Sequence, residues 1–163
     1  MNGETAEVVH ATRAAFTTGT ERFAFQLGGG PYLAALSLDF VTLRWPHLFW
    51  ELVHFRVNAF ISVGAVEVGS VVGYPLRLDA VGRHEVRFGV ALGFASVMRN
   101  HEGTYNGFGV TPQVSYLLRR SQHLAFEFTA SVLFAVAGKY SDVEGTPPER
   151  PPPCPIGAFG LRF

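Results

Sequence analysis

The segment Leu124–Val136 reads LAFEFTASVLFAV, with an apolar side chain at every second position from Leu124 onward. The positions between them hold mostly small or polar residues, among them Glu127, Thr129 and Ser131. A period of two residues is typical of a β-strand whose two faces meet different surroundings. At about 3.3 Å per residue the segment would extend over about 40 Å, whereas strands usually have about five or six residues.

The same alternation recurs along most of the chain, which has 163 residues. In the stretch that follows His84, for example, Phe88, Val90 and Leu92 alternate with Gly89 and Ala91. Strands are predicted at 21–28, 32–44, 49–64, 70–80, 85–98, 107–118, 123–138 and 156–163. The sequence therefore predicts an all-β fold, an eight-stranded antiparallel up-and-down transmembrane β-barrel over 21–163. Residues 1–20 are predicted to form an N-terminal periplasmic tail or extension.

The connections between the predicted strands alternate in character. Short turns are expected at 45–47, 81–84 and 119–122. The other series contains two longer connections, at 100–106 and the Pro-rich 140–155, and two short ones, at 28–31 and 66–69. An even number of strands places both chain termini on the side of the short turns. This is the layout of a membrane barrel with short periplasmic turns and longer outer loops.

The composition excludes several classes of protein. Hydrophobic residues make up 48% of the chain and charged residues 16%, with a net charge of zero. Neither a disordered chain nor a nucleic-acid-binding surface is expected from these values. No stretch approaches the roughly 18 apolar residues of a membrane-spanning helix. Because Glu4, Glu7 and Arg13 interrupt the first fifteen residues, no signal peptide is recognisable, and we expect it to have been removed.

The two faces of the predicted strands indicate which one is outside. One face is a belt of Phe, Leu and Val, whereas the other carries Gly, Ala, Ser and Thr with isolated charges. Small residues suit the narrow interior of an eight-stranded barrel. An apolar belt suits lipid, where a closed barrel pairs every backbone group. The alternation places these charged or titratable residues inside: Asp39, His54, Arg56, Arg77, Asp79, Arg87, Glu127 and Arg162.

These inner charges are expected to pair with one another, because an isolated buried charge costs several kcal/mol. The interior is then closed by an Arg/Asp/Glu network. The alternative is a narrow pore for small solutes or ions. A wide channel is not expected, because side chains just fill an eight-stranded interior.

The C-terminal segment Ile156–Phe163 carries a recognisable pattern. It ends in Phe163, with Leu161 and Phe159 two and four positions earlier, and resembles the assembly signal of bacterial outer-membrane β-barrels. Together with the eight alternating segments, the chain resembles small barrels of the OmpA or OmpX type. The resemblance covers 21–163 and implies a Gram-negative outer membrane. Its implied partners are outer-membrane lipids, lipopolysaccharide, the barrel-assembly machinery during insertion, and other envelope proteins.

Aromatic residues near predicted strand ends fit the interfacial girdle of a membrane barrel. They are Trp45 and Trp50, on either side of a short turn, and Tyr116, near another. The segment 147–155 holds six prolines and the lone Cys154. It is expected to be a stiff loop that shields the barrel mouth or docks a partner.

A catalytic site has little support in the sequence. Some small outer-membrane barrels modify lipid A, and a set of His101, Ser96 and Glu102 is conceivable, but its spacing does not require it. No catalytic, cofactor-binding or metal-binding residues and no cofactor are therefore predicted. The expected role is structural, as a scaffold, an interaction partner or a subunit of an envelope complex. A porin-like narrow pore and a lipid A-modifying enzyme are the alternatives.

Overall fold

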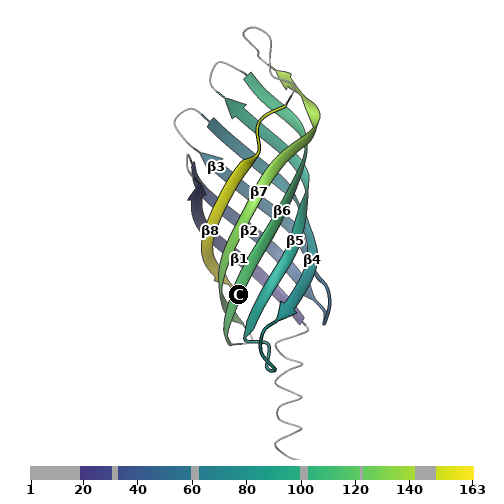
Figure 1. Cartoon of the computed structure of the whole chain (residues 1–163), viewed down its shortest axis with the longest axis vertical. Coiled ribbons are helices and arrows are strands. Elements are labelled where there is room, and N and C mark those ends of the chain that lie inside the picture. The colour runs from purple at the N-terminus through teal and green to yellow at the C-terminus, as the bar shows by residue number, and fades with distance from the viewer. Residues whose placement is uncertain (1–18, 31–32, 60–62, 100–102, 122, 142–149) are drawn as a thin grey trace, which may run out of the picture.

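A computed structural model describes residues 19–30, 33–59, 63–99, 103–121, 123–141 and 150–163. Within them, eight strands form one closed barrel in which each strand pairs antiparallel with the next along the chain (Figure 1). The strands are β1 (Gly19–Gly30), β2 (Leu33–Arg44), β3 (Phe49–Ala59), β4 (Val63–Arg77), β5 (His84–Arg99), β6 (Gly103–Ser121), β7 (Leu124–Ser141) and β8 (Cys154–Arg162). The predicted all-β, eight-stranded antiparallel barrel is confirmed. The described residues contain no helix of the length and apolarity needed to cross a membrane.

The barrel closes between its first and last strands. β1 pairs with β8 from Ala24, opposite Arg162, to Gly29, opposite Gly157. Beyond the Ala24–Arg162 pair, the backbone N–H of Phe163 donates to the carbonyl of Phe23 at 2.7 Å. The C-terminus therefore lies at the end where β2 turns into β3, β4 into β5 and β6 into β7, visible at the bottom of Figure 1. We call this end the turn end and the opposite one the loop end.

Several predicted connections are wrong in their extent, among them 66–69 and 100–106. Residues 66–69 lie within β4, because Val66 and Val68 face outward and Glu67 inward, so that the alternation continues between Gly64 and Gly69. Residues 103–106 belong to β6 and pair with β5 from Arg99, opposite Gly103. Glycine marks both places, but here it lies within or at the start of a strand. Part of the predicted tail also differs, since β1 begins at Gly19; residues 1–18 lie outside the described residues.

Glycine permits close contact between strands in the barrel wall. Gly69 of β4 lies opposite Gly93 of β5. A Cβ atom on Gly93 would lie 2.1 Å from the carbonyl oxygen of Val68, and one on Gly69 would lie 2.3 Å from that of Leu92. These distances exclude any side chain without a backbone shift, which explains part of the high glycine content.

The side-chain alternation reverses at the turn end of three neighbouring strands. In each of them two inward-facing residues are three positions apart: Glu21 and Ala24 in β1, Asp39 and Thr42 in β2, and Glu51 and His54 in β3. In β2 the reversal falls at Val41, whose φ of 58° is unusual for a β-branched residue. In β3 it falls at a register shift between Glu51 and His54. The reversal adds polar side chains to the interior that strict alternation would place outside.

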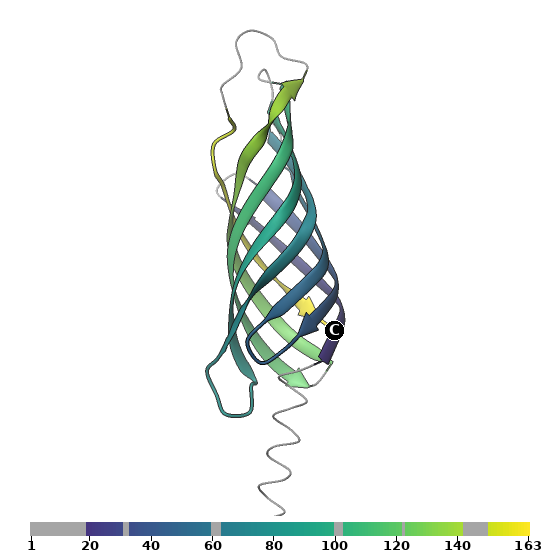
Figure 2. The ribbon, with the colours of Figure 1, turned by 90° about the vertical axis from the view of Figure 1, so that its right-hand side faces the viewer.

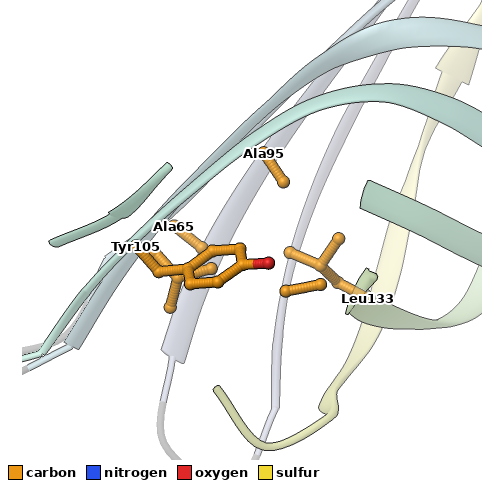
Figure 3. Close-up of a cluster of buried hydrophobic side chains, with 6 residues drawn as sticks. Ala65, Ala95, Tyr105 and Leu133 are labelled. Atoms are coloured by element: carbon orange, nitrogen blue, oxygen red, sulfur yellow. The ribbon is translucent and has the colours of Figure 1, made fainter. Parts of the chain in front are cut away.

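The interior has two parts of different chemistry. Charged side chains fill it from the turn end to the middle. Towards the loop end it is filled by what we call the loop-end cluster, made of Ala65, Ala95, Val97, Tyr105, Leu133 and Ala135. Figure 3 shows Tyr105 and Leu133 of this cluster pointing toward one another across the interior, with Ala65 and Ala95 beside them. The strands wrap around both parts with a strong common tilt (Figure 2).

Candidate functional site

The charged side chains buried in the barrel are the most distinctive site of the molecule. Among the described residues they comprise six carboxylates, five arginines and one histidine, each no more than 7% exposed. We call this set the charge network: Glu21, Asp39, Arg44, Glu51, His54, Arg56, Glu67, Glu85, Arg87, Arg119, Glu127 and Arg162. The predicted Arg/Asp/Glu network inside the barrel is confirmed. All eight strands contribute to it, so that no single hairpin assembles it.

Arg162 of β8 is the centre of the network. Its Nη2 atom lies 3.2 Å from Asp39 Oδ2, 2.6 Å from Glu51 Oε1 and 2.9 Å from Glu127 Oε2. Its Nη1 donates to Thr42 Oγ1 at 2.5 Å. One guanidinium therefore joins carboxylates from β2, β3 and β7 across the interior.

Glu21 of β1 is a second centre, closer to the turn end. Its carboxylate lies 3.1 Å from Arg44 Nε, 3.4 Å from Arg87 Nη2 and 3.4 Å from Arg162 Nη1. It also accepts a hydrogen bond from Arg119 Nη1. A single carboxylate thus contacts four guanidinium groups, and this excess of positive charge is relieved by the neighbouring acids.

Glu85 is the neighbouring acid that shares two of these arginines. Its Oε1 atom accepts from Arg87 Nε at 2.6 Å and lies 3.4 Å from Arg119 Nη2. The Arg87 guanidinium also lies over the ring of Phe49, 4.8 Å from its centroid. Such a cation–π contact supplements the ion pairs where water is excluded.

Arg56 crosses the middle of the barrel. Its guanidinium donates to Ser131 Oγ at 3.1 Å and to Gln113 Oε1 at 3.3 Å, and it lies 3.5 Å from Glu67 Oε2. Thr111 Oγ1 donates to Glu67 Oε1 at 2.6 Å. The side chains therefore bridge β3, β4, β6 and β7 and occupy the cross-section below the loop-end cluster.

The predicted inner charges divide into two groups. Asp39, His54, Arg56, Arg87, Glu127 and Arg162 are buried in the charge network. Arg77 lies opposite Glu85 at the end of β4 and is half-buried; its Nη2 lies 3.5 Å from the carbonyl of Trp45. Asp79 lies beyond β4 in the turn, outside the network, because β4 ends two residues before it.

Asp79 caps the β4–β5 turn. Its Oδ1 accepts from the backbone N–H of His84 at 3.0 Å. Slight burial raises the pKa of the Asp79 carboxyl, but hydrogen bonds from the backbone N–H groups of His84, Arg83 and Gly82 outweigh it and hold the pKa below its usual value. The residue is therefore a turn cap rather than a member of the interior.

Six residues of the charge network are missing from the sequence prediction. Two of them continue the inward alternation of β5 and β6: Glu85 is the first residue of the predicted strand 85–98, and Arg119 directly follows the predicted strand 107–118, so the two-residue period indicates both. Glu67 falls in a predicted connection. The other three, Glu21, Arg44 and Glu51, face inward because of the reversal in β1, β2 and β3, which no periodicity in the sequence indicates.

A metal site inside the barrel is poorly supported. Ligand atoms of Asp39, Glu51 and His54 lie within 4.8 Å of one another. However, both carboxylates already bind Arg162, and His54 Nδ1 lies 2.5 Å from Asp39 Oδ1. A metal ion would have to displace a guanidinium from its counter-charges, so the arrangement favours a closed set of ion pairs.

Of the possible catalytic set, only Ser96 lies within the described residues. Ser96 Oγ donates to Asn106 Oδ1 at 2.8 Å, which ties this hydroxyl to the neighbouring strand. His101 and Glu102 lie outside the described residues.

The predicted interfacial aromatics gather toward the turn end. Trp45 and Trp50 are 41% and 44% exposed, and Trp50 Nε1 donates to Ser70 Oγ at 2.6 Å. Tyr116 lies half-buried beside His84, with its hydroxyl 2.6 Å from His84 Nδ1. Phe159 and Phe163 of the terminal pattern face outward.

Comparisons of this chain with protein-family models, curated proteins and solved structures find no match.

Proposed function

We propose that this chain is an integral β-barrel of a bacterial outer membrane, with a structural, scaffold or interaction role. The observation that carries the proposal is its inverted polarity. Among the described residues, all twelve side chains of the charge network are buried, whereas large apolar side chains such as Phe88, Leu92, Phe94 and Phe128 are between 42% and 52% exposed. Soluble proteins bury charge rarely and seldom expose a large contiguous apolar surface.

The distribution of outward residues supports a lipid-facing wall. Between His84 and Met98 of β5, the exposed residues are Phe88, Val90, Leu92, Phe94 and Met98, all apolar. The tryptophans at the turn end have the amphipathic character of an interfacial girdle. A closed barrel leaves no strand edge unpaired, which is the condition for crossing hydrocarbon with β-strands.

The proposed role is non-enzymatic and does not depend on conduction. Ion pairs occupy the lower interior, and the loop-end cluster occupies the upper interior. A narrow pore is the alternative function, and a current recording in a planar bilayer tests for it. Purified protein in a planar bilayer should give no resolved ion steps, and steady steps would replace the scaffold role with that of a pore.

A substitution on the outer wall tests the membrane location directly. Leu92 lies near the middle of β5 and is 42% exposed. In a lipid-facing wall, Leu92→Arg should reduce the free energy of unfolding by about 2–4 kcal/mol. In a water-facing wall, the same change should stay within about 0.5 kcal/mol. Leu92→Val is the matched control, and the measurement is reversible unfolding in urea from phospholipid vesicles.

The location also predicts a simple biochemical behaviour. The protein should fractionate with the outer membrane, require detergent for solubility and migrate differently on a gel before and after heating. Lipids, lipopolysaccharide and the barrel-assembly machinery are its proposed partners. A detergent-free soluble monomer would exclude the proposal. Unchanged lipid A in cells with and without the protein is the expected result for a non-enzyme.

A further inference from the structure

The charge network lacks one positive charge. Among the described residues it contains six carboxylates and five guanidinium groups, all buried. Five positive charges against six negative ones leave an excess of one negative charge in the interior. An uncompensated charge away from water is strongly destabilising. The twelfth member of the network is His54, and histidine is the side chain that can be neutral or cationic near neutral pH.

The negative excess lies in the part of the network around His54. Two arginines face four carboxylates there: Arg56 and Arg162 with Asp39, Glu51, Glu67 and Glu127. Toward the turn end the balance is reversed, and three arginines face two carboxylates: Arg44, Arg87 and Arg119 with Glu21 and Glu85. Arg77, half-buried opposite Glu85, adds positive charge at that end as well. The missing positive charge is therefore needed on the side of His54.

Both ring nitrogens of His54 face carboxylates on the neighbouring strands. Nδ1 lies 2.5 Å from Asp39 Oδ1 on β2, and Nε2 lies 4.0 Å from Glu67 Oε2 on β4. Neither His54 Nε2 nor Glu67 Oε2 has a hydrogen-bond partner among the described residues. A neutral imidazole donates through one nitrogen and presents a lone pair on the other. Whichever nitrogen carried the single proton, that lone pair would point toward a carboxylate.

The guanidinium groups near His54 are already shared or engaged. Arg162 contacts three carboxylates of this part of the network and lies 3.4 Å from a fourth near the turn end. Arg56 lies 3.5 Å from Glu67, and its hydrogen bonds go to neutral side chains. A carboxylate oxygen of Glu51 also lies within 4.8 Å of a His54 ring nitrogen. The ring is therefore surrounded by more negative charge than the arginines compensate.

We propose that His54 is the sixth cation of the charge network, an imidazolium held between Asp39 and Glu67 whose second ring proton stabilises the barrel. With this proton the network is neutral, and without it one carboxylate is uncompensated. A histidine in an unfolded chain has a pKa of about 6.5, so at about pH 8 the folded chain holds one proton more than the unfolded chain. The stability of the barrel therefore falls as the pH rises. The inference concerns the interior and does not depend on what surrounds the outer wall.

The first test compares the pH dependence of urea unfolding between the full chain and His54→Gln. The matched control is His123→Gln, because His123 is exposed. Between about pH 7.5 and 8.5 an unfolded histidine is neutral, and one extra proton in the folded state raises the unfolding equilibrium constant about tenfold per pH unit. The unaltered chain and His123→Gln should exceed His54→Gln by this factor, since all other groups titrate alike in the three chains. An equal pH dependence in all three would overturn the inference.

Removing one carboxylate tests the charge balance. Glu67→Gln leaves five carboxylates against five guanidinium groups, so the network no longer needs the imidazolium. In the chain that keeps His54, this change should abolish the extra pH dependence. Combined with His54→Gln, it should raise the stability at about pH 8 above that of His54→Gln alone. A further loss of stability in the double variant would overturn the inference.

Nuclear magnetic resonance of the unaltered chain gives a result that requires no variant. With nitrogen-15 in the histidine rings, one ring protected from solvent should carry protons on both nitrogens at about pH 8, where an exposed histidine is neutral. A protected ring with a single proton would place the extra proton on a carboxylate and overturn the inference. A stability that depends on sodium concentration at constant ionic strength would overturn it in favour of a metal ion as the sixth cation.

Discussion

The barrel interior is filled differently in its lower part, toward the turn end, and its upper part, toward the loop end. The charge network fills the lower part with paired long side chains, whereas the loop-end cluster fills the upper part with Tyr105, Leu133 and small residues. Ion pairs are sensitive to the loss of a single partner, because the other charge stays buried. Apolar packing is sensitive to volume instead. The two parts should therefore respond to different substitutions.

The largest effect is expected at the centre of the charge network. Arg162→Met removes the guanidinium that joins Asp39, Glu51 and Glu127. Breaking a buried pair costs about 3–5 kcal/mol, so this variant should fold poorly or lose at least that much unfolding free energy in vitro. The exposed Arg120 provides the control Arg120→Met. Equal stability of the two variants would show that the network does not hold the lower interior.

A deletion in the loop-end cluster should have the next largest effect. Leu133 is 2% exposed, and Leu133→Ala leaves a cavity that should cost about 2–5 kcal/mol. Its neighbour Phe134 faces outward at 39% exposure, so Phe134→Leu is the control and should change little. Urea unfolding from phospholipid vesicles measures both. A neutral Leu133→Ala would mean that the upper interior is not tightly packed.

Overfilling the same region should give a smaller loss. A Cβ on Gly109 would lie 2.8 Å from Ala95 Cβ and 3.1 Å from Leu133 Cδ1. Gly109→Ala should therefore cost about 1–3 kcal/mol. Gly157→Ala is the matched control in the same unfolding measurement, because a Cβ on Gly157 would meet only the Gly29 carbonyl oxygen, at an ordinary contact distance of 3.6 Å. If both variants are equally stable, the cluster has more room than its contacts indicate.

The smallest effect is expected outside both parts, at the β4–β5 turn. Asp79 caps this turn as a carboxylate, and its lowered pKa means that the charged form stabilises the folded state. That contribution is present above the unfolded-state pKa of about 3.9 and is lost as the pH falls through the folded-state pKa. Asp79→Asn should cost less than about 1 kcal/mol at pH 7. The difference from the unaltered chain should shrink below about pH 4; a difference independent of pH would contradict the capping role.

Much of the architecture was predictable from local pattern. The two-residue alternation, clear in β5 and β7, recurs in eight segments. It therefore indicates the number of strands and which face of each carries the small residues. It also leads to Asp39, Arg87, Glu127 and Arg162 as interior charges. Two of the misplaced connections contain a glycine, Gly69 or Gly103, a residue that is common in turns. At Gly69 it serves close contact between strands, and at Gly103 it begins one.

The sequence by itself determined the eight-stranded barrel, because a two-residue period sorts side chains to opposite faces whatever the neighbouring strand is. Only the tertiary structure decided which residues complete the charge network. Glu21, Arg44 and Glu51 face inward because three adjacent strands reverse their alternation at the same end of the barrel. That reversal is stabilised by arginines on β5, β6 and β8. A contact between strands so distant in the chain leaves no trace in the local pattern of any one of them.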